Sequence, residues 1–109
     1  MWLLINNKLL GLLGLCAKAG KIVSGADACL EEIKTNNVKL LIIAEDASDK
    51  TKKNYIFYGD KYNIPVAIVS TVDSLSKAIG KKNRAIIGIK DINLSNEIQK
   101  IINGGEIIG

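Results

Sequence analysis

A glycine at the start of a predicted helix is the first feature of this chain that could bind a ligand. A short strand at residues 21–23 leads through Ser24 and Gly25 into a helical pattern, and Lys18 and Lys21 stand just before this turn. The first amides of a helix have no partner within it, and its N-terminus carries roughly half a positive charge. Because Gly25 has no side chain, another backbone could approach closely. The segment could hold a sugar-phosphate backbone and the base edges of distorted RNA; the alternative is a simple capping turn beside two solvated lysines.

The charge balance favours an acidic partner. The 109 residues include 15 Lys and Arg against 11 Asp and Glu, which gives a net charge of +4. Phosphate backbones are common partners of basic proteins, and positive charge also gathers at residues 50–53 and 81–84. Few aromatic side chains are free to stack on bases, because we assign to the core Tyr55, Phe57, Tyr58 and Tyr62. This argues against a protein that binds single strands by stacking.

The chain lacks the residue types and motifs on which most enzymes depend. The chain has no His, and no Gly-rich phosphate loop or dinucleotide fingerprint follows a strand. Cys16 and Cys29 lie in apolar helical patterns, so we expect buried free thiols rather than metal ligands. Glu45 and Asp46 follow a buried strand and could hold Mg²⁺ in an enzyme, but carboxylates are also favoured at a helix start. We therefore expect no enzyme, no metal and no cofactor.

The hydrophobic pattern predicts helices and strands in strict alternation. Strands are expected at residues 21–23, 38–44, 66–69 and 85–89, and the expected helix N-caps are Ser24, Ser48 or Asp46, Thr71 and Ser95. Such alternation indicates an α/β fold, with a central sheet that carries helices on both faces. We expect one domain over residues 1–109, ending in a loose tail at residues 104–105.

The N-terminal apolar segment is predicted to be a helix that faces the core. Ile5, Leu9, Leu13 and Cys16 recur at helical spacing, and polar residues at positions 6–8 interrupt the segment. It is too short to span a bilayer, and this helical pattern argues against a signal peptide. Together with the two free thiols, this favours a cytoplasmic protein.

Four short motifs resemble those of one protein superfamily. They are GKIVSG at residues 20–25, KLLIIAEDAS at residues 39–48, NIPV at residues 63–66 and AIG at residues 78–80. In this order and at these separations they resemble the kink-turn-binding ribosomal protein superfamily, which contains the large-subunit proteins called seven-Ae and thirty-e. The chain is most similar to their small bacterial relatives of the YlxQ type, over about residues 5 to 103.

The resemblance implies a three-layer α/β/α sandwich with a mixed sheet of about four strands. It also implies an RNA face made of the start of the second helix, the start of the third helix, and a loop accompanied by a basic residue before the last strand. The residues on this face would be Gly25, Ala26, Asp27, Ala28, Glu31, Ser48, Ser70, Thr71, Val72 and Arg84. In the superfamily these segments cradle an RNA kink, in which sheared G·A pairs expose guanine edges and one nucleotide is flipped out.

The chain departs from the superfamily pattern at several of these positions. Asp27 replaces an Asn, Ala28 a Glu and Glu31 a Lys, and Val72 stands where a Lys is usual. An ionised Asp cannot donate a hydrogen bond, and two carboxylates near phosphates would repel them. We therefore predict RNA binding with weaker kink-turn specificity.

Three function hypotheses follow from the sequence. The first is a non-catalytic cytoplasmic protein that binds structured RNA, either ribosomal RNA, with association with the ribosome itself, or another kink-turn RNA. We expect neither DNA nor a membrane as a partner. The alternative is a protein–protein interaction module on the same fold, which the positive net charge weighs against. The third hypothesis is the Mg²⁺ enzyme that would use Glu45 and Asp46.

Overall fold

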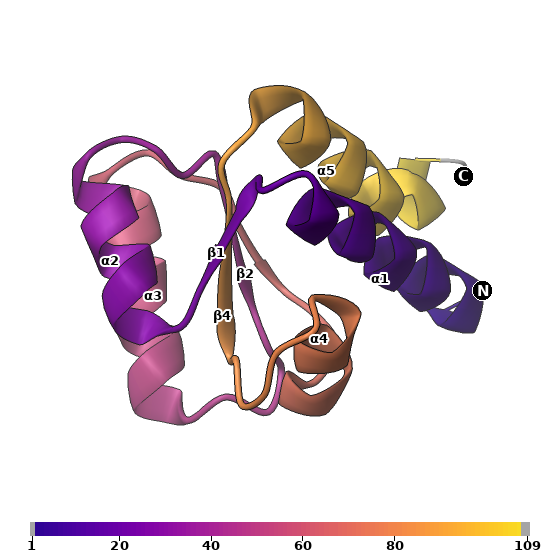
Figure 1. The fold of residues 1–109 in the computed structure, drawn as a ribbon, viewed down its shortest axis with the longest axis horizontal. Coiled ribbons are helices and arrows are strands. Elements are labelled where there is room, and N and C mark those ends of the chain that lie inside the picture. The colour runs from indigo at the N-terminus through magenta and orange to yellow at the C-terminus, as the bar shows by residue number, and fades with distance from the viewer. Residues whose placement is uncertain (1, 108–109) are drawn as a thin grey trace.

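The computed structural model describes residues 2–107, and its elements alternate as the sequence predicts (Figure 1). In chain order they are α1 (Trp2–Lys18), β1 (Ile22–Ser24), α2 (Ala26–Lys34), β2 (Leu40–Ile43), α3 (Asp49–Lys61), β3 (Val66–Ile68), α4 (Val72–Ala78), β4 (Ile86–Ile89) and α5 (Ile92–Ile107). Within the described range, no helix is both long enough and apolar enough to cross a membrane.

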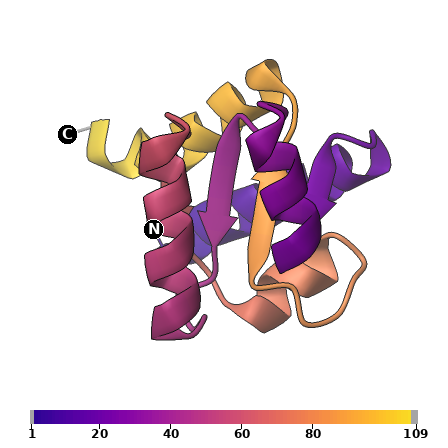
Figure 2. The ribbon, with the colours of Figure 1, turned by 90° about the vertical axis from the view of Figure 1, so that its left-hand side faces the viewer.

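The strands form one mixed sheet in the order β1-β4-β2-β3. Strands β2 and β3 run parallel, whereas β4 runs antiparallel to both β1 and β2. Helices α2 and α3 cover one face of this sheet, and α1, α4 and α5 cover the other (Figures 1 and 2). This is the three-layer α/β/α arrangement that the resemblance implies.

The core lies on both faces of the two central strands. Every residue of β2 and β4 is buried, which explains why their sequences are apolar without alternation. From α1 come the buried side chains of Leu9, Leu13 and Cys16, as the helical spacing predicts. Cys16 and Cys29 are both buried and free, so that prediction is confirmed.

The strand directions bring three helix starts to one end of the sheet. Strands β1, β2 and β3 all finish at this end, where β4 begins, because β4 is antiparallel to its neighbours. Helices α2, α3 and α4 therefore start there, next to one another (Figure 1, lower part). We call this the Gly25 end. The other end, where β1 begins and β4 finishes, is the Lys21 end.

Two of the predicted N-caps are confirmed and two are wrong. The hydroxyl oxygens of Ser48 and Thr71 accept hydrogen bonds from backbone amides of the first turns of α3 and α4. At α2 the N-cap is Gly25 and not Ser24, because the chain turns at Gly25 with a φ of 91°. At α5 the helix begins three residues before the predicted cap, and Ser95 lies buried inside it, with its hydroxyl donating to the Lys39 carbonyl.

Some other local observations depend on side-chain packing or on the length of a helix, and here the structure differs from the sequence-based expectation. Phe57, expected in the core, is 58% exposed. The buried residues of α2 are Cys29 and Ile33, whereas Ala26 at its start is exposed. Strand β3 lies at the edge of the sheet, and Ile68 is 40% exposed. The expected loose tail at residues 104–105 is part of α5.

Candidate nucleic-acid interface

The start of α2 is open and has no side-chain cap. Gly25 donates its own amide to the Ile86 carbonyl at 3.1 Å, and its carbonyl accepts from the Cys29 amide at 3.0 Å. No side chain among the described residues caps the helix, in contrast to α3 and α4. Ala26, Asp27 and Ala28 are all exposed at this turn. Their first-turn amides are therefore available to an acceptor from outside the chain.

The Arg84 guanidinium lies against the turn at Ser24 and Gly25. Its Nη1 donates to the Ser24 carbonyl at 3.4 Å, and a Cβ placed on Gly25 would lie 2.8 Å from the same nitrogen. The positive φ and this close contact explain why the position is a glycine. The half-buried Arg84 side chain thus places a fixed positive charge next to the start of α2.

Arg84 retains a hydrogen-bond donor that the protein does not use. Its backbone amide donates to the hydroxyl oxygen of Ser76 at 2.8 Å, and Ser76 is itself buried, so the arginine backbone is fixed. Within residues 2–107, the buried Nε of Arg84 has no hydrogen-bond partner. A guanidinium presents its donors in a planar fork that suits phosphate or a base edge.

Two side-chain hydrogen bonds hold α2 in place, one from a distant helix and one to the neighbouring strand β1. The Tyr55 hydroxyl, from α3, donates to the Ala26 carbonyl at 2.7 Å, and the Cys29 thiol donates to the Val23 carbonyl at 3.5 Å. Burial is the main cause that raises the pKa of Tyr55 to about 12 and the pKa of Cys29 to about 12. Both side chains therefore stay protonated at neutral pH, and their role is to position the helix.

The second and third predicted segments meet beside the first. Asp46, which follows β2, accepts a hydrogen bond at Oδ1 from the Val72 amide at 2.8 Å. The Glu45 amide donates to the carbonyl of Ser70, a buried residue with a φ of 62°. Asp46 thus supports the start of α4 and not that of α3, where Ser48 is the cap. Among residues 2–107, no three His, Cys, Asp or Glu side chains lie close enough together to hold a metal ion.

A pocket of about 530 Å³ extends this surface along α4. Its walls include Asp46, Val72, Ser76, Lys77, Lys81 and Lys82. Asp73 lines the pocket as well and pairs with Lys77 at 3.1 Å, so three lysines outnumber two carboxylates along its walls. The basic stretch at residues 81–84 therefore lies at the Gly25 end, next to the loop at Thr71 and Val72.

Lys18 and Lys21 do not flank Gly25 in the structure. Lys21 pairs with Lys90 at the other end of β1, where the Lys90 amide donates to the Lys21 carbonyl at 2.8 Å. Gly25 is four positions after Lys21 along an extended chain, which corresponds to about 13 Å. Lys18 ends α1 on the Lys21 side. The structure brings together the other predicted site residues and leaves these two apart.

Comparison with known protein families shows to which family this chain is related. The model that describes the ribosomal protein L7Ae/L30e/S12e/Gadd45 family matches residues 7–99. The chain belongs to this family. The L7Ae-family match contains all four motifs and every predicted site residue, from Lys18 to Arg84.

Curated relatives and solved structures agree with this membership. The chain is 33% identical over 92 residues to a protein called RNA-binding protein YlxQ from Bacillus subtilis, covering 84% of this chain and 92% of that protein. It is 29% identical to RNA-binding protein YlxQ from Enterococcus faecium, covering 91% and 95%. A Bacillus halodurans protein of unknown function matches with a TM-score of 0.85 at 35% identity, covering 88% of this chain and 97% of that one. The Giardia lamblia 15.5kD RNA binding protein shares the fold, with a TM-score of 0.76 at 21% identity, covering 96% and 90%.

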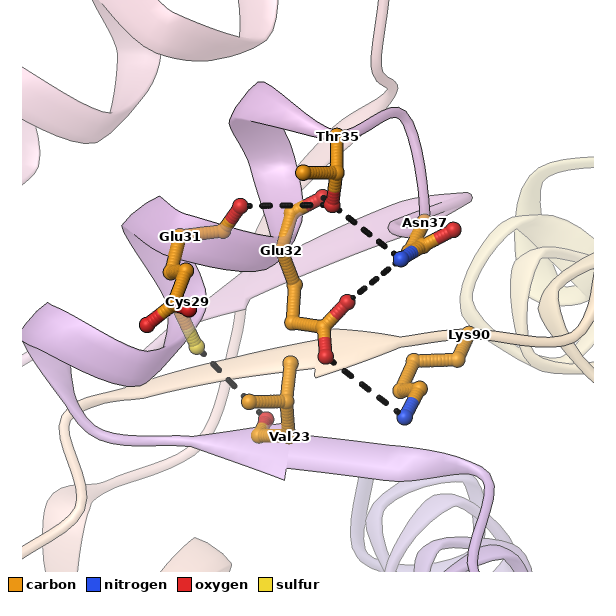
Figure 3. A network of polar contacts seen from close by, with 7 residues as sticks. All are labelled: Val23, Cys29, Glu31, Glu32, Thr35, Asn37 and Lys90. Carbon is orange, nitrogen blue, oxygen red and sulfur yellow. Dashed lines mark hydrogen bonds and ion pairs between the residues drawn. The ribbon is translucent and has the colours of Figure 1, made fainter.

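Helix α2 carries three acidic residues, of which one is neutralised and two are exposed. Glu32 accepts from Asn37 at 2.7 Å and pairs with Lys90 at 3.8 Å, at the Lys21 end of the helix (Figure 3). Asp27 and Glu31 are exposed and make no ion pair within the described part of the chain. In this L7Ae-family member two free carboxylates therefore remain on the side of α2 that the resemblance assigns to RNA.

Two of the contacts that shape this site could not be predicted from the sequence. The hydrogen bond of Tyr55 to Ala26 spans 29 residues, and that of Asp46 to Val72 spans 26. Neither residue pair forms a local motif. The sequence does indicate Gly25 and Arg84 as site residues, but it does not indicate that they are in contact.

Proposed function

We propose that this protein binds structured RNA at the Gly25 end of the sheet and does so without catalysis. The observation that carries the proposal is the uncapped start of α2 with the Arg84 guanidinium behind it, one donor of which is unused. Membership of the L7Ae family and the RNA-binding names of its YlxQ relatives support the same function.

The chemistry of this surface fits a bent RNA better than a regular duplex. The exposed first turn at Ala26 and Asp27 offers free amides, and the Arg84 guanidinium fills the space beside Gly25 where a side chain would stand. A helical RNA displays its base edges poorly, whereas a kink or internal loop exposes them to such donors. Lys81 and Lys82, beside the pocket, would contribute salt-dependent attraction to phosphates.

The proposed RNA is of the kink-turn type, and the proposed setting is the cytoplasm, on ribosomal RNA or another kinked RNA. Asp27 and Glu31 lower the expected affinity, because carboxylates repel phosphates. They do not block the amides or Arg84. The proposal is therefore a preference for kinked over unkinked RNA, with moderate affinity.

A gel-shift titration with a kink-turn RNA and an unkinked duplex of matched length tests the proposal. We expect tighter binding to the kinked RNA. Equal, weak binding to both would reject kink recognition, and no binding to either would reject the RNA-binding function itself.

A charge placed at the start of α2 locates the site. Ala26→Glu adds a carboxylate at an exposed first-turn position, where the helix tolerates it well, and should weaken kink-turn binding. A substitution of Gly25 suits this purpose less, because any side chain there is strained and meets Arg84. The matched control is Asn93→Glu, which adds the same charge to the exposed first turn of α5 at the Lys21 end. Equal losses for the two variants would remove the start of α2 from the interface.

A further inference from the structure

The outward face of α3 carries apolar side chains that the fold does not use. Ile56 is 46% exposed and Phe57 is 58% exposed. Lys53 and Asp60 are also exposed, and the four residues follow the spacing i, i+3, i+4, i+7, so they lie along one face of the helix. We call Lys53, Ile56, Phe57 and Asp60 the α3 stripe. It lies apart from the start of α2, on the other side of the helix from Tyr55.

The apolar surface continues from the stripe onto the edge of the sheet. Val66 packs against α3, since a Cβ on Gly59 would meet its side chain. Alternate residues of a strand point to one face, so Ile68 shares the α3 face with Val66. Ile68 is 40% exposed, and the outer side of β3 has no strand partner among residues 2–107. Three exposed apolar side chains therefore belong to one side of the molecule.

The order of charges along the stripe is complementary to itself. Lys53 lies at one end, Asp60 at the other, and the two apolar residues lie between them. In an antiparallel pair of α3 helices centred between Ile56 and Phe57, each Lys53 would face Asp60 of the second copy. Each Ile56 would face Phe57 of the second copy. Neither charged residue has an ion-pair partner within the described part of its own chain.

We infer that this protein forms a symmetric homodimer through the α3 stripe. A two-fold interface requires the same patch on both copies to be self-complementary, which is the property that the stripe has. The contact is small, so the dimer is weak and forms in a concentration-dependent way.

Sedimentation equilibrium of the full chain, free of RNA, over a wide concentration range tests the inference. We expect reversible association to a dimer. Phe57→Glu should abolish it without unfolding the protein, because the side chain is exposed. Leu15→Glu is the matched control, since Leu15 is 62% exposed on α1, and it should leave the association unchanged. A monomer at every concentration, or equal loss in both variants, would overturn the inference.

A charge exchange tests the antiparallel geometry. Lys53→Glu and Asp60→Lys should each weaken dimerisation, by roughly tenfold, because each dimer contains the altered contact twice. The double variant carries both charges in reversed order and should restore the original association. Failure of the double variant to recover would contradict the pairing. Phe57→Glu should bind kink-turn RNA like the wild type, so the test of dimerisation and that of RNA binding can fail separately.

Discussion

The two ends of the sheet both carry lysines, but they offer them to a ligand very differently. At the Lys21 end, Lys90 pairs with Glu32 and Lys39 donates to the Asn36 carbonyl, where α2 has just ended. At the Gly25 end, three helices begin, one of them has no side-chain cap, and Arg84 retains an unused donor. Helix N-termini attract anions and C-termini repel them. We therefore place the proposed RNA site at the Gly25 end, on the basis of the direction of its helices and of Arg84 rather than of the number of cations.

Removing the Arg84 charge should give the largest effect on RNA binding. Arg84→Gln keeps a similar length but loses the fork, and a hydrogen bond to a charged group is worth about 1.5–3 kcal/mol, or roughly 10–100-fold in affinity. The measurement is a kink-turn titration at fixed salt concentration. Lys100→Gln, at an exposed position of α5, is the control and should change little. A loss of less than twofold for Arg84→Gln would place the guanidinium outside the interface.

Reversing the acidic departures on α2 should strengthen binding. Asp27→Asn combined with Glu31→Lys removes two carboxylates and adds one cation at the Gly25 end. A charge contact in water is worth about 1 kcal/mol, so we expect a gain of about tenfold, reduced at high salt. The titration is repeated at two salt concentrations. An unchanged affinity would show that this side of α2 does not approach the phosphates.

Loss of the Tyr55 hydroxyl should loosen α2. Tyr55→Phe leaves the Ala26 carbonyl without this donor and should cost about 1 kcal/mol of unfolding free energy. For a chain of this size this corresponds to a fall of about 4–8 °C in Tm. RNA affinity should fall by a smaller factor than in Arg84→Gln. A Tm equal to that of the wild type would mean that the hydrogen bond does not hold the helix.

The same side chain predicts a pH dependence. The folded state raises the pKa of Tyr55 to about 12, above its ordinary value, so folding favours the neutral phenol. The resulting stabilisation is complete below the unfolded pKa of about 10 and is lost as the pH rises towards 12. Urea unfolding between pH 9 and pH 11.5 measures this decline. It should be shallower in Tyr55→Phe, and identical slopes would contradict the assignment.

The smallest effect is expected at the Lys21 end. Lys18→Gln combined with Lys21→Gln removes two cations from the Lys21 end, where the backbone of Lys21 is about 13 Å from Gly25. Long-range attraction is screened at that distance, so the loss of kink-turn affinity should be about twofold or less at physiological salt. A loss as large as that of Arg84→Gln would mean that the RNA extends along β1, and the contrast between the two ends would fail.

The element order and half of the caps could be predicted because their causes are local. Ser48 and Thr71 each bond an amide three residues away, and the apolar runs of β2 and β4 reflect burial on both faces. The cap at α2 could not be assigned correctly, because the choice between Ser24 and Gly25 depends on the backbone turn.

The site could be predicted only in part, because its arrangement depends on the packed sheet. The sequence indicates Gly25 and Arg84 separately, but they meet only because β1 and β4 are adjacent and antiparallel. The same pairing places Lys21 at the other end of β1. This separation could not be predicted from the short distance between Lys21 and Gly25 in the sequence. The exposure of Phe57 also depends on how α3 is oriented on the sheet, and no local pattern specifies it.

The most direct test of the account is to map the RNA on the protein surface by amide chemical shifts. During titration with a kink-turn RNA, we predict that the largest changes fall on residues 24–28, on Thr71 and Val72, and on Arg84. Changes centred on Lys18, Lys21 and Lys90, with the start of α2 unaffected, would contradict the claim that the uncapped helix start and its arginine form the RNA-binding site.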